Sequence, residues 1–149
     1  MCKVYGYCRI SRSTQNIDRQ VRNIMAAYPE AVIIRENGVT GTTMNRDEWK
    51  KLMKRVDEGK VDHIIFDSVS RMSRNADEGI KTYFELFDKG VQLSFLKEAY
   101  IDTSVYAENL KDKVELQGTD EDELFKGINN YFRVLAKKQI RIAFEQAEK

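Results

Sequence analysis

Four short apolar runs, separated by amphipathic segments, are the feature that most constrains the fold of this chain. The runs are rich in β-branched and aromatic residues and cover residues 3–8, 31–35, 61–66 and 91–96. The segments between them place apolar side chains at helical spacing and cover residues 14–27, 46–59 and 77–89. Strands that alternate with helices in this way predict an α/β fold, with a mostly parallel sheet of four to five strands and helices on both faces.

Proline and glycine residues mark the expected ends of these helices. Pro29 ends the first helix, and Gly59 and Gly90 end the second and third. The run at 31–35 is expected to be a short buried strand, and residues 37–45 a polar loop without period. The expected inward faces of the three helices comprise Ile17, Val21, Ile24, Met25 and Tyr28, then Trp49, Leu52, Met53 and Val56, then Ile80, Tyr83, Phe84 and Phe87.

The pattern changes after the fourth apolar run. Residues 97–119 are polar and mixed, so they are expected to hold at most an edge strand or a short helix. A single helical period then returns over residues 120–149. A helix of this length spans roughly 45 Å at 1.5 Å rise per residue, which exceeds the width of a domain this small. We therefore divide the chain into a domain at 1–119 and a long helix at 120–149, part of which is expected to pack on another partner.

Composition excludes several classes of protein. No apolar run approaches the length of a membrane span or a signal peptide. Cys2 and Cys8 lie on one expected strand, too far apart to bridge each other, which favours a reducing, cytoplasmic location. The net charge of +1 gives no general basic excess, so any phosphate-binding surface must come from the local placement of arginines.

The stretch Y-C-R-I-S-R-S-T-Q-N-I-D-R-Q at residues 7–20 joins the first strand to the first helix. Ligands of open α/β sheets bind where strands end and helices begin. Ser11 lies here between Arg9 and Arg12, and Ser13 and Thr14 follow. These hydroxyl residues have the usual preference for a helix cap, whereas a hydroxyl between two guanidinium groups also suits a nucleophile beside a phosphate.

A second strand-to-helix junction shifts the balance toward the nucleophile. The motif S-R-M-S-R places Arg71 and Arg74 three residues apart at the start of the third helix. Because strands one and three are parallel, this junction and Ser11 belong to the same edge of the sheet. Arg46 begins a further helix on that edge. Solvated surface arginines are the simpler explanation, but several helix starts with arginines around one serine favour a phosphate site.

These motifs together resemble the catalytic domain of the serine recombinases, the resolvase/invertase family of site-specific DNA recombinases. The resemblance covers most of the chain and is carried by Y-G-Y-C-R-I-S, N-I-D-R-Q, T-G-T-T-M-N-R, S-R-M-S-R-N, F-L-K-E-A-Y-I-D-T-S and the terminal helix. Small resolvases usually have an aspartate before the first of the paired arginines, where this chain has Ser70. That departure places the chain nearer the large serine recombinase branch of mobile elements.

The resemblance implies a role for each candidate residue. Ser11 would attack a DNA phosphodiester and form a 5′-phosphoserine linkage, and Arg9, Arg71 and Arg74 would bind the scissile phosphate. Arg46 and Gln20 would assist in binding DNA phosphate. The family uses no metal and no cofactor, and its partners are DNA and further copies of the chain, a homodimer that becomes a homotetramer. The terminal helix would serve dimerisation and DNA tracking, with recombination by cleavage and rejoining of strands, including integration.

Two other functions remain compatible with the residues. One is a non-catalytic, DNA-associated assembly module that keeps the fold and the long helix. The other is a flavodoxin-like domain that binds a nucleotide or phosphate through the same arginines. His63 is the lone histidine and is expected to be structural, and Asp67 lacks the further carboxylates that a magnesium site generally needs. No DNA-recognition domain is visible within the 149 residues, so this chain alone is expected to be inactive on specific sites.

Overall fold

A parallel four-stranded sheet forms the centre of the molecule, a computed structural model that describes residues 3–9, 17–36, 39–40, 43–44, 46–73, 75–105 and 121–147. Its strands are β1 (Val4–Arg9), β2 (Val32–Glu36), β5 (His63–Phe66) and β6 (Gln92–Phe95). They pair in the order β2-β1-β5-β6, and every pairing is parallel. The predicted α/β class and strand alternation are confirmed.

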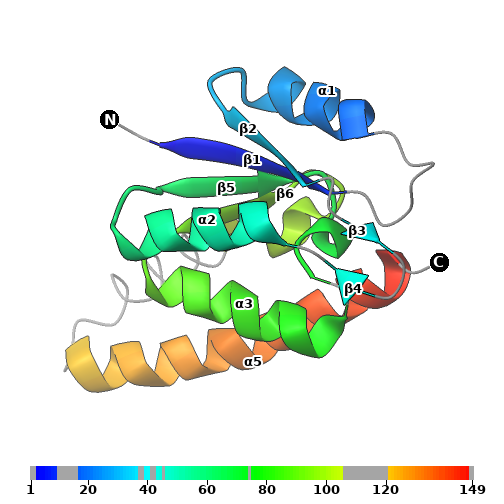
Figure 1. Cartoon of the computed structure of the whole chain (residues 1–149). Helices are drawn as coiled ribbons and strands as arrows, with labels where there is room; N and C mark the ends of the chain where they lie inside the picture. Colours follow the sequence, from blue (N-terminus) through cyan, green and yellow to red (C-terminus); the bar gives the residue numbers. More distant parts are fainter. Residues whose placement is uncertain are drawn as a thin grey trace.

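The connecting helices cover both faces of the sheet (Figure 1). They are α1 (Ile17–Ala27), α2 (Asp47–Asp57) and α3 (Ala76–Asp88). Side chains alternate along β1, so Val4 and Cys8 pack toward α1 while Tyr5 and Tyr7 pack toward α2 and α3. On the α1 side, a Cβ at Gly6 would lie 2.8 Å from Ile24 Cγ2, so glycine allows this helix to approach the sheet closely.

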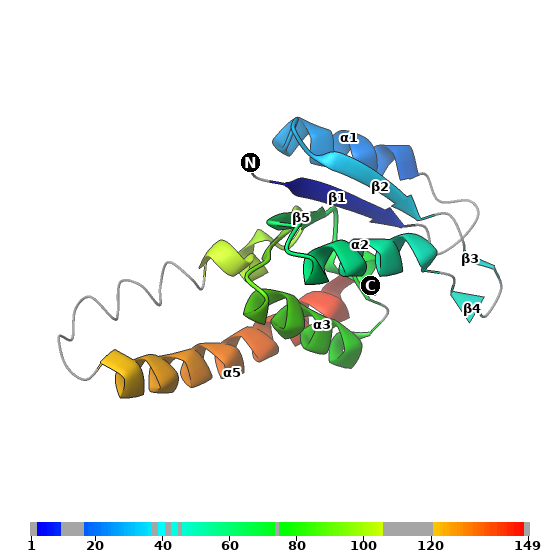
Figure 2. The same ribbon diagram turned by 60° about the vertical axis from the view of Figure 1, so that its left-hand side comes forward.

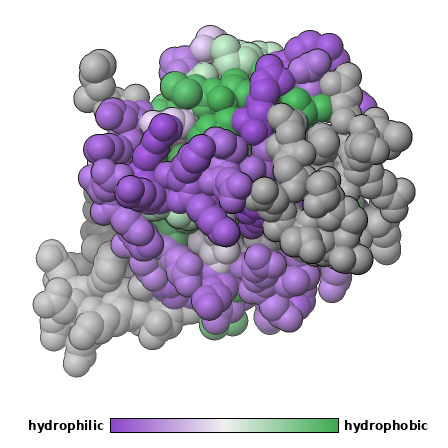
Figure 3. All heavy atoms as spheres, viewed as in Figure 1, coloured by the Kyte–Doolittle hydropathy of each residue, from purple (hydrophilic) through white to green (hydrophobic). Residues whose placement is uncertain are grey.

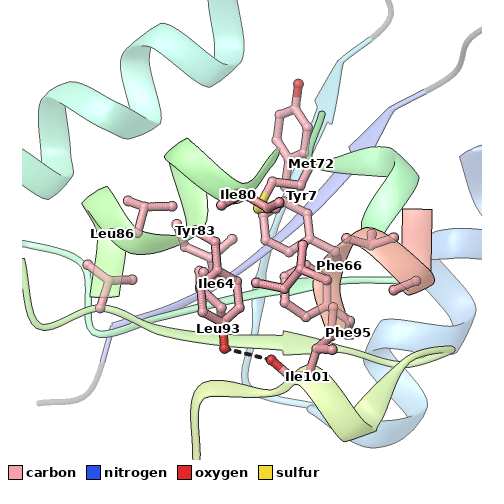
Figure 4. Close-up of a cluster of buried hydrophobic side chains, with 14 of the residues drawn as sticks. Tyr7, Ile64, Phe66, Met72, Ile80, Tyr83, Leu86, Leu93, Phe95 and Ile101 are labelled. Atoms are coloured by element: carbon pink, nitrogen blue, oxygen red, sulfur yellow. Dashed lines mark hydrogen bonds between the residues drawn. The ribbon is translucent and has the colours of Figure 1, made fainter. Parts of the chain in front are cut away.

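The larger core lies on the α2 and α3 side of the sheet (Figure 4). Phe66 and Phe95 stack with ring centroids 5.3 Å apart, and Tyr83 stacks on Phe95 at 6.2 Å. The Tyr83 hydroxyl donates a hydrogen bond to the Ile101 carbonyl at 2.7 Å, which ties α3 to the 3-10 turn η2 (Ala99–Ile101). The outer surface over α2 and α3 is mostly hydrophilic (Figure 3), as expected for helices that bury one face.

The long helix α5 (Glu121–Ala147) runs beside α3, with its C-terminal end at the edge to which the strands point (Figures 1 and 2). We call the contact between these helices the α3–α5 seam. From α5 it buries Phe132, Ala136, Ile140, Ala143 and Phe144. A Cβ at Gly79 would lie 2.2 Å from Phe144 Cζ, so the absence of a side chain on α3 makes room for that ring. The C-terminal half of the predicted helix therefore packs on its own domain.

Side chains after β6 complete the open edge of that strand. The Leu93 N–H donates to Thr103 Oγ1 at 2.9 Å, and the Phe95 N–H donates to Asp102 Oδ1 at 2.7 Å. These acceptors take the place of a neighbouring strand, which keeps main-chain donors of an edge strand satisfied. The predicted irregular segment thus contains η2 and this side-chain edge, while residues 106–120 lie outside the described part of the chain.

Three expectations about local structure were wrong in part. The run at 31–35 is not a buried strand, because β2 is at the edge of the sheet and Val32 is 56% exposed. The expected loop at 37–45 includes a small antiparallel pair, β3 (Val39–Thr40) with β4 (Thr43–Met44). On α3 Leu86, which the expected inward face left out, is fully buried together with Tyr83, whereas Phe84 and Phe87 are only half-buried.

Candidate active site

The 3-10 turn η1 (Val69–Arg71), which directly follows β5, is the centre of the candidate site. Its start is capped by Ser68, whose hydroxyl accepts a hydrogen bond from the Ser70 N–H. Val69 and Met72 are fully buried and anchor the turn in the core. We call the carboxyl ends of β1 and β5, together with η1, the strand-end edge.

Arg9 at the end of β1 reaches across to η1. Its side chain is 3% exposed, its Nε donates to the Arg71 carbonyl at 3.1 Å, and one of its terminal nitrogens donates to the Ser70 carbonyl. Guanidinium groups have no acceptor and a fixed fork of donors, so bonds to two successive carbonyls fix the orientation of the group. Arg9 therefore joins two strand ends into one rigid unit.

Gln20 holds the main chain of the same residue. The Arg9 N–H donates to Gln20 Oε1 at 3.1 Å, and Gln20 Nε2 donates to the Arg9 carbonyl at 2.9 Å. The Gln20 side chain is 3% exposed, and both ends of its amide are used in this pair. Gln20 thus supports the main chain of Arg9 at the strand-end edge.

Arg46 approaches η1 from the start of α2. One of its terminal nitrogens donates to the Met72 carbonyl at 2.8 Å, and its guanidinium carbon lies 4.4 Å from the Trp49 ring centroid. The Arg46 Nε is buried and has no hydrogen-bond partner among the described residues. A buried, unpaired donor on a cation costs free energy unless a ligand or water completes it.

A buried carboxylate holds α2 in place. Glu36, 2% exposed at the end of β2, accepts from the N–H groups of Glu48 and Trp49 at 3.2 and 3.0 Å. It also accepts from the Tyr7 hydroxyl at 3.0 Å. The first N–H groups of a helix lack internal partners, so Glu36 acts as their cap and fixes where Arg46 begins the helix. Burial raises the pKa of the Tyr7 hydroxyl to about 12, so Tyr7 stays a neutral donor to Glu36.

Arg71 is the half-buried cation of the turn itself. Burial lowers its pKa from the ordinary value, and the nearby Asp67 carboxylate opposes that shift, so the guanidinium remains protonated. Asp67 is 3% exposed, accepts from Asn23 Nδ2 at 2.9 Å and lies 3.4 Å from Lys97 Nζ. Among the described residues no three His, Cys, Asp or Glu side chains are grouped closely enough to hold a metal ion.

The candidate residues divide into those that the structure brings together and those that it does not describe. Arg9, Arg46 and Arg71, from three different elements, all meet at η1. Ser11 and Arg74 lie outside the described residues, as does Arg12. His63 is half-buried, with Nε2 2.7 Å from Ser94 Oγ, which agrees with the structural role predicted for it.

Two carboxylates of the site were not predicted, Glu36 and Glu98. Glu98 follows β6 and bonds to Ser68 and Val69 at the start of η1. The signal in the sequence was their position: V-I-I-R-E and F-L-K-E each place a carboxylate directly after an apolar strand. A charged residue there is rarely buried unless paired, so only the folded contacts reveal its function.

Fold and site together define a parallel α/β domain whose strand-end edge gathers arginines from several elements around one turn. The chain belongs to the resolvase N-terminal domain family, the catalytic domain of the serine recombinases, because the model of that family matches residues 4–147. None of the helices in the described ranges is long and apolar enough to span a membrane.

Individual relatives agree with this assignment. A resolvase/recombinase of Pseudomonas putida is 30% identical over 96 residues, covering 64% of this chain and 52% of that protein. A resolvase of Clostridium perfringens is 27% identical over 99 residues, covering 66% of this chain and 51% of that protein. The chain thus spans about half the length of these curated relatives.

Solved structures share the fold. The N-terminal catalytic domain of TP901-1 integrase aligns with a TM-score of 0.59 at 22% identity, covering 89% of this chain and 98% of that domain. A resolvase family site-specific recombinase from Streptococcus pneumoniae aligns with a TM-score of 0.58 at 22% identity, covering all of both chains. The predicted fold class is confirmed by these likenesses.

Proposed function

We propose that this chain is the catalytic domain of a site-specific DNA recombinase in which Ser11 is the nucleophile. The observation that carries the proposal is the meeting of Arg9, Arg46 and Arg71 at η1 in a chain of the resolvase family. Ser11 follows Arg9 by two residues in the sequence, and Arg9 is fixed to η1.

The reaction exchanges one phosphodiester for another. Ser11 Oγ forms a bond to the DNA phosphorus and loses its proton, while the bond from phosphorus to the 3′ oxygen breaks and that oxygen leaves as a hydroxyl. The product is a 5′-phosphoserine linkage with no net change in the number of ester bonds. Rejoining reverses the step with a 3′-hydroxyl from another broken end, so the reaction requires no external energy source.

The arginines divide into two roles in this proposal. Arg71, Arg74 and Arg46 neutralise the charge that develops on the phosphate, as fixed cations do in phosphoryl transfer. The unpaired Arg46 Nε supplies a donor for a phosphate oxygen. Arg9, which is buried, contributes positive charge and, together with Gln20, holds the strand-end edge rigid. Preorganised donors are effective because they need no reorganisation when the charge appears.

DNA and further copies of the chain are the partners in this proposal. Strand exchange requires both duplexes to be held together, which is the role of the dimer that becomes a tetramer. The helix α5 suits dimerisation and DNA tracking because Val134, Leu135 and Ile142 are apolar but 56%, 36% and 41% exposed. Exposed apolar residues on one helix favour a protein contact. Residues 1–119 would then carry the chemistry, and residues 120–149 the assembly.

Trapping of covalent protein–DNA adducts tests the proposal. The natural protein that carries this sequence is incubated with its DNA substrate and denatured before rejoining. We expect Ser11→Ala to remove the adducts completely, while the matched control Ser13→Ala retains them, because only one of the two hydroxyls is the nucleophile. Adducts of Ser11→Ala at the level of the wild type would contradict the proposal, as would a wild-type protein that forms none.

A further inference from the structure

The Glu98 side chain is a buried carboxylate that contacts the beginning of η1 with both of its oxygens. It is 7% exposed, and its Oε1 accepts from the Ser68 hydroxyl at 3.0 Å. Its Oε2 accepts from the Val69 N–H, also at 3.0 Å. Burial raises the pKa of this carboxyl, and the two hydrogen bonds oppose that shift. Burying this carboxylate costs desolvation free energy, so we look for a specific role of the side chain beyond stabilising the fold.

The hydrogen bond from Ser68 determines how the turn begins. Because the Ser68 hydroxyl donates its proton to Glu98, its lone pairs remain available to the Ser70 N–H, which lies 3.4 Å from Ser68 Oγ. Ser68 has an extended backbone and is the N-terminal cap of η1. Glu98 thus fixes the direction of the cap as well as the Val69 N–H, two of the donors at the start of the turn.

The opposite end of the same turn carries the arginines. The carbonyls of Ser70 and Arg71 accept from Arg9, and the carbonyl of Met72 accepts from Arg46. A rotation of η1 would therefore move all of these carbonyls and the Arg71 side chain together. Glu98 contacts the first end of η1 and the guanidinium groups contact the other, and η1 is only three residues long.

We propose that Glu98 is a positioning residue of the active site, which holds η1 in the rotation that presents Arg71 and orients Arg9 and Arg46. This inference rests on the proposed function for its effect on DNA cleavage. Glu98 lies in the segment that follows β6, and the proposal gives it no contact with the phosphate.

The surroundings of Glu98 explain why hydrogen bonds are needed here. A hollow of about 320 Å³ borders the turn on this side and is lined by Ser70, Arg71, Lys97 and Glu98 with Gln146 and Ala147 of α5. Apolar packing anchors η1 through Val69 and Met72, which are fully buried. On the hollow side the carboxylate supplies the contacts that resist rotation.

Glu98→Gln is the appropriate variant because it preserves shape. A glutamine oxygen still accepts from the Val69 N–H, but its NH2 group then faces Ser68, whose hydroxyl must reverse and accept, so the charge-assisted hydrogen bond donated by Ser68 is lost. Asp102→Asn is the matched control, since it removes a charge from the same loop and the amide oxygen still accepts from the Phe95 N–H. This hydrogen bond of Asp102 is made to β6. Ser68→Ala is a second variant that removes only the hydroxyl.

Cleavage and DNA affinity are measured separately in the natural protein that carries this sequence. We expect Glu98→Gln and Ser68→Ala to reduce the single-turnover rate of adduct formation at least about tenfold, the effect of one lost buried hydrogen bond. DNA affinity and the rate for Asp102→Asn should stay within about twofold of the wild type, a small energy on this scale. Wild-type rates in both variants at η1 would overturn the inference, as would a loss of affinity equal to the loss of rate.

A readout without DNA separates this inference from the proposed function. The Nε–H proton of Arg9 is held by the Arg71 carbonyl, and its exchange with solvent is measurable by NMR on this chain. Exchange should accelerate at least about tenfold in Glu98→Gln, since the opening equilibrium shifts with the lost contact, and should not change in Asp102→Asn. Unchanged exchange in Glu98→Gln would overturn the inference. A wild-type protein that forms no adducts would contradict the proposed function alone.

Discussion

At the strand-end edge buried side chains bond to main-chain carbonyls, whereas in the α3–α5 seam buried side chains contact one another. Arg9 Nε donates to the Arg71 carbonyl at 3.1 Å, Arg46 donates to the Met72 carbonyl at 2.8 Å, and Gln20 pairs with the main chain of Arg9. The seam instead places the Phe144 ring over Gly79.

The difference follows from what each region must do. Apolar contacts are non-directional and scale with buried area, so the seam stabilises the fold without fixing any group to a fraction of an ångström. Hydrogen bonds to charged donors are directional and stronger, so the edge fixes guanidinium groups at a cost in desolvation. Substitutions in the seam should therefore lower the free energy of unfolding with little effect on DNA cleavage. Substitutions at the edge should slow DNA cleavage with little effect on the free energy of unfolding.

Phe144→Ala should give the largest effect in the seam. Removing a fully buried aromatic ring costs about 3–5 kcal/mol of unfolding free energy, measured by chemical denaturation. The ring is 2% exposed and packs where α3 has no side chain. A cost below about 1 kcal/mol would show that the seam does not bury this ring in solution.

Gly79→Ala is the control that tests whether the ring and the glycine are matched. Helix propensity alone predicts that this change stabilises α3 by about 1 kcal/mol. We expect destabilisation by about 1–3 kcal/mol instead, because the new Cβ would overlap the ring. In the double variant with Phe144→Ala the clash disappears, so the two costs should be strongly non-additive. Additive costs would contradict direct contact between them.

Arg9→Lys should give the largest effect at the edge. Lysine keeps the charge but cannot donate to two carbonyls in a fixed plane, so we expect the single-turnover rate of DNA cleavage to fall about 100-fold. The matched control is Arg35→Lys on the neighbouring strand, whose side chain is 45% exposed and pairs with Asp18. That change should alter stability by less than about 0.5 kcal/mol and leave cleavage unaffected. Equal cleavage by Arg9→Lys and wild type would break the distinction between the regions.

The smallest effect is expected at Asp102, where a polar contact lies beside the core. Burial raises the pKa of this carboxyl to about 6, while the hydrogen bond from the Phe95 N–H opposes the shift and nearby Glu98 adds to it. The unfolded chain releases this proton near pH 4, so it binds fewer protons than the folded chain between about pH 4 and 6. Unfolding free energy should therefore fall as pH rises through that range.

Asp102→Asn removes this titration and keeps the acceptor for Phe95. Relative to wild type, the variant should gain about 2 kcal/mol between pH 4 and pH 7, measured as the difference in unfolding free energy. Glu98 titrates in both proteins and largely cancels in that difference. A constant difference across this range would mean that Asp102 is ionised in the fold at pH 4.

Most elements of the fold were predictable because each has a local signal. Strand-forming runs, helical periods and the glycines at 59 and 90, with φ of 72° and 81°, are properties of neighbouring residues. The exposure of Val32 was not predictable, since apolar runs do not reveal which strand is at the edge. Leu86 belongs to the core, whereas Phe84 and Phe87 are half-buried with the Arg133 guanidinium 5.1 and 5.9 Å from their ring centroids, a contact between distant residues that no local pattern predicts.

The site was predictable in its residue types but not in its contacts. Arginines at strand ends were visible in the sequence, and the parallel sheet placed them on one edge. That Arg9 and Gln20 are buried and face main-chain groups depends on the path of η1, which no local pattern encodes. Glu36 and Glu98 were missed for the same reason, because their donors lie 12 and 29 residues away or more.

The most direct test of the central claim is the identity of the residue joined to DNA. Trapped adducts are digested with nuclease and protease, and the modified peptide is sequenced by mass spectrometry. The structure and family predict a nucleotide attached through its 5′ phosphate to Ser11, with Arg9 and Arg71 required for its formation. A 5′ linkage to any other residue, or a 3′ linkage to Ser11, would contradict the account.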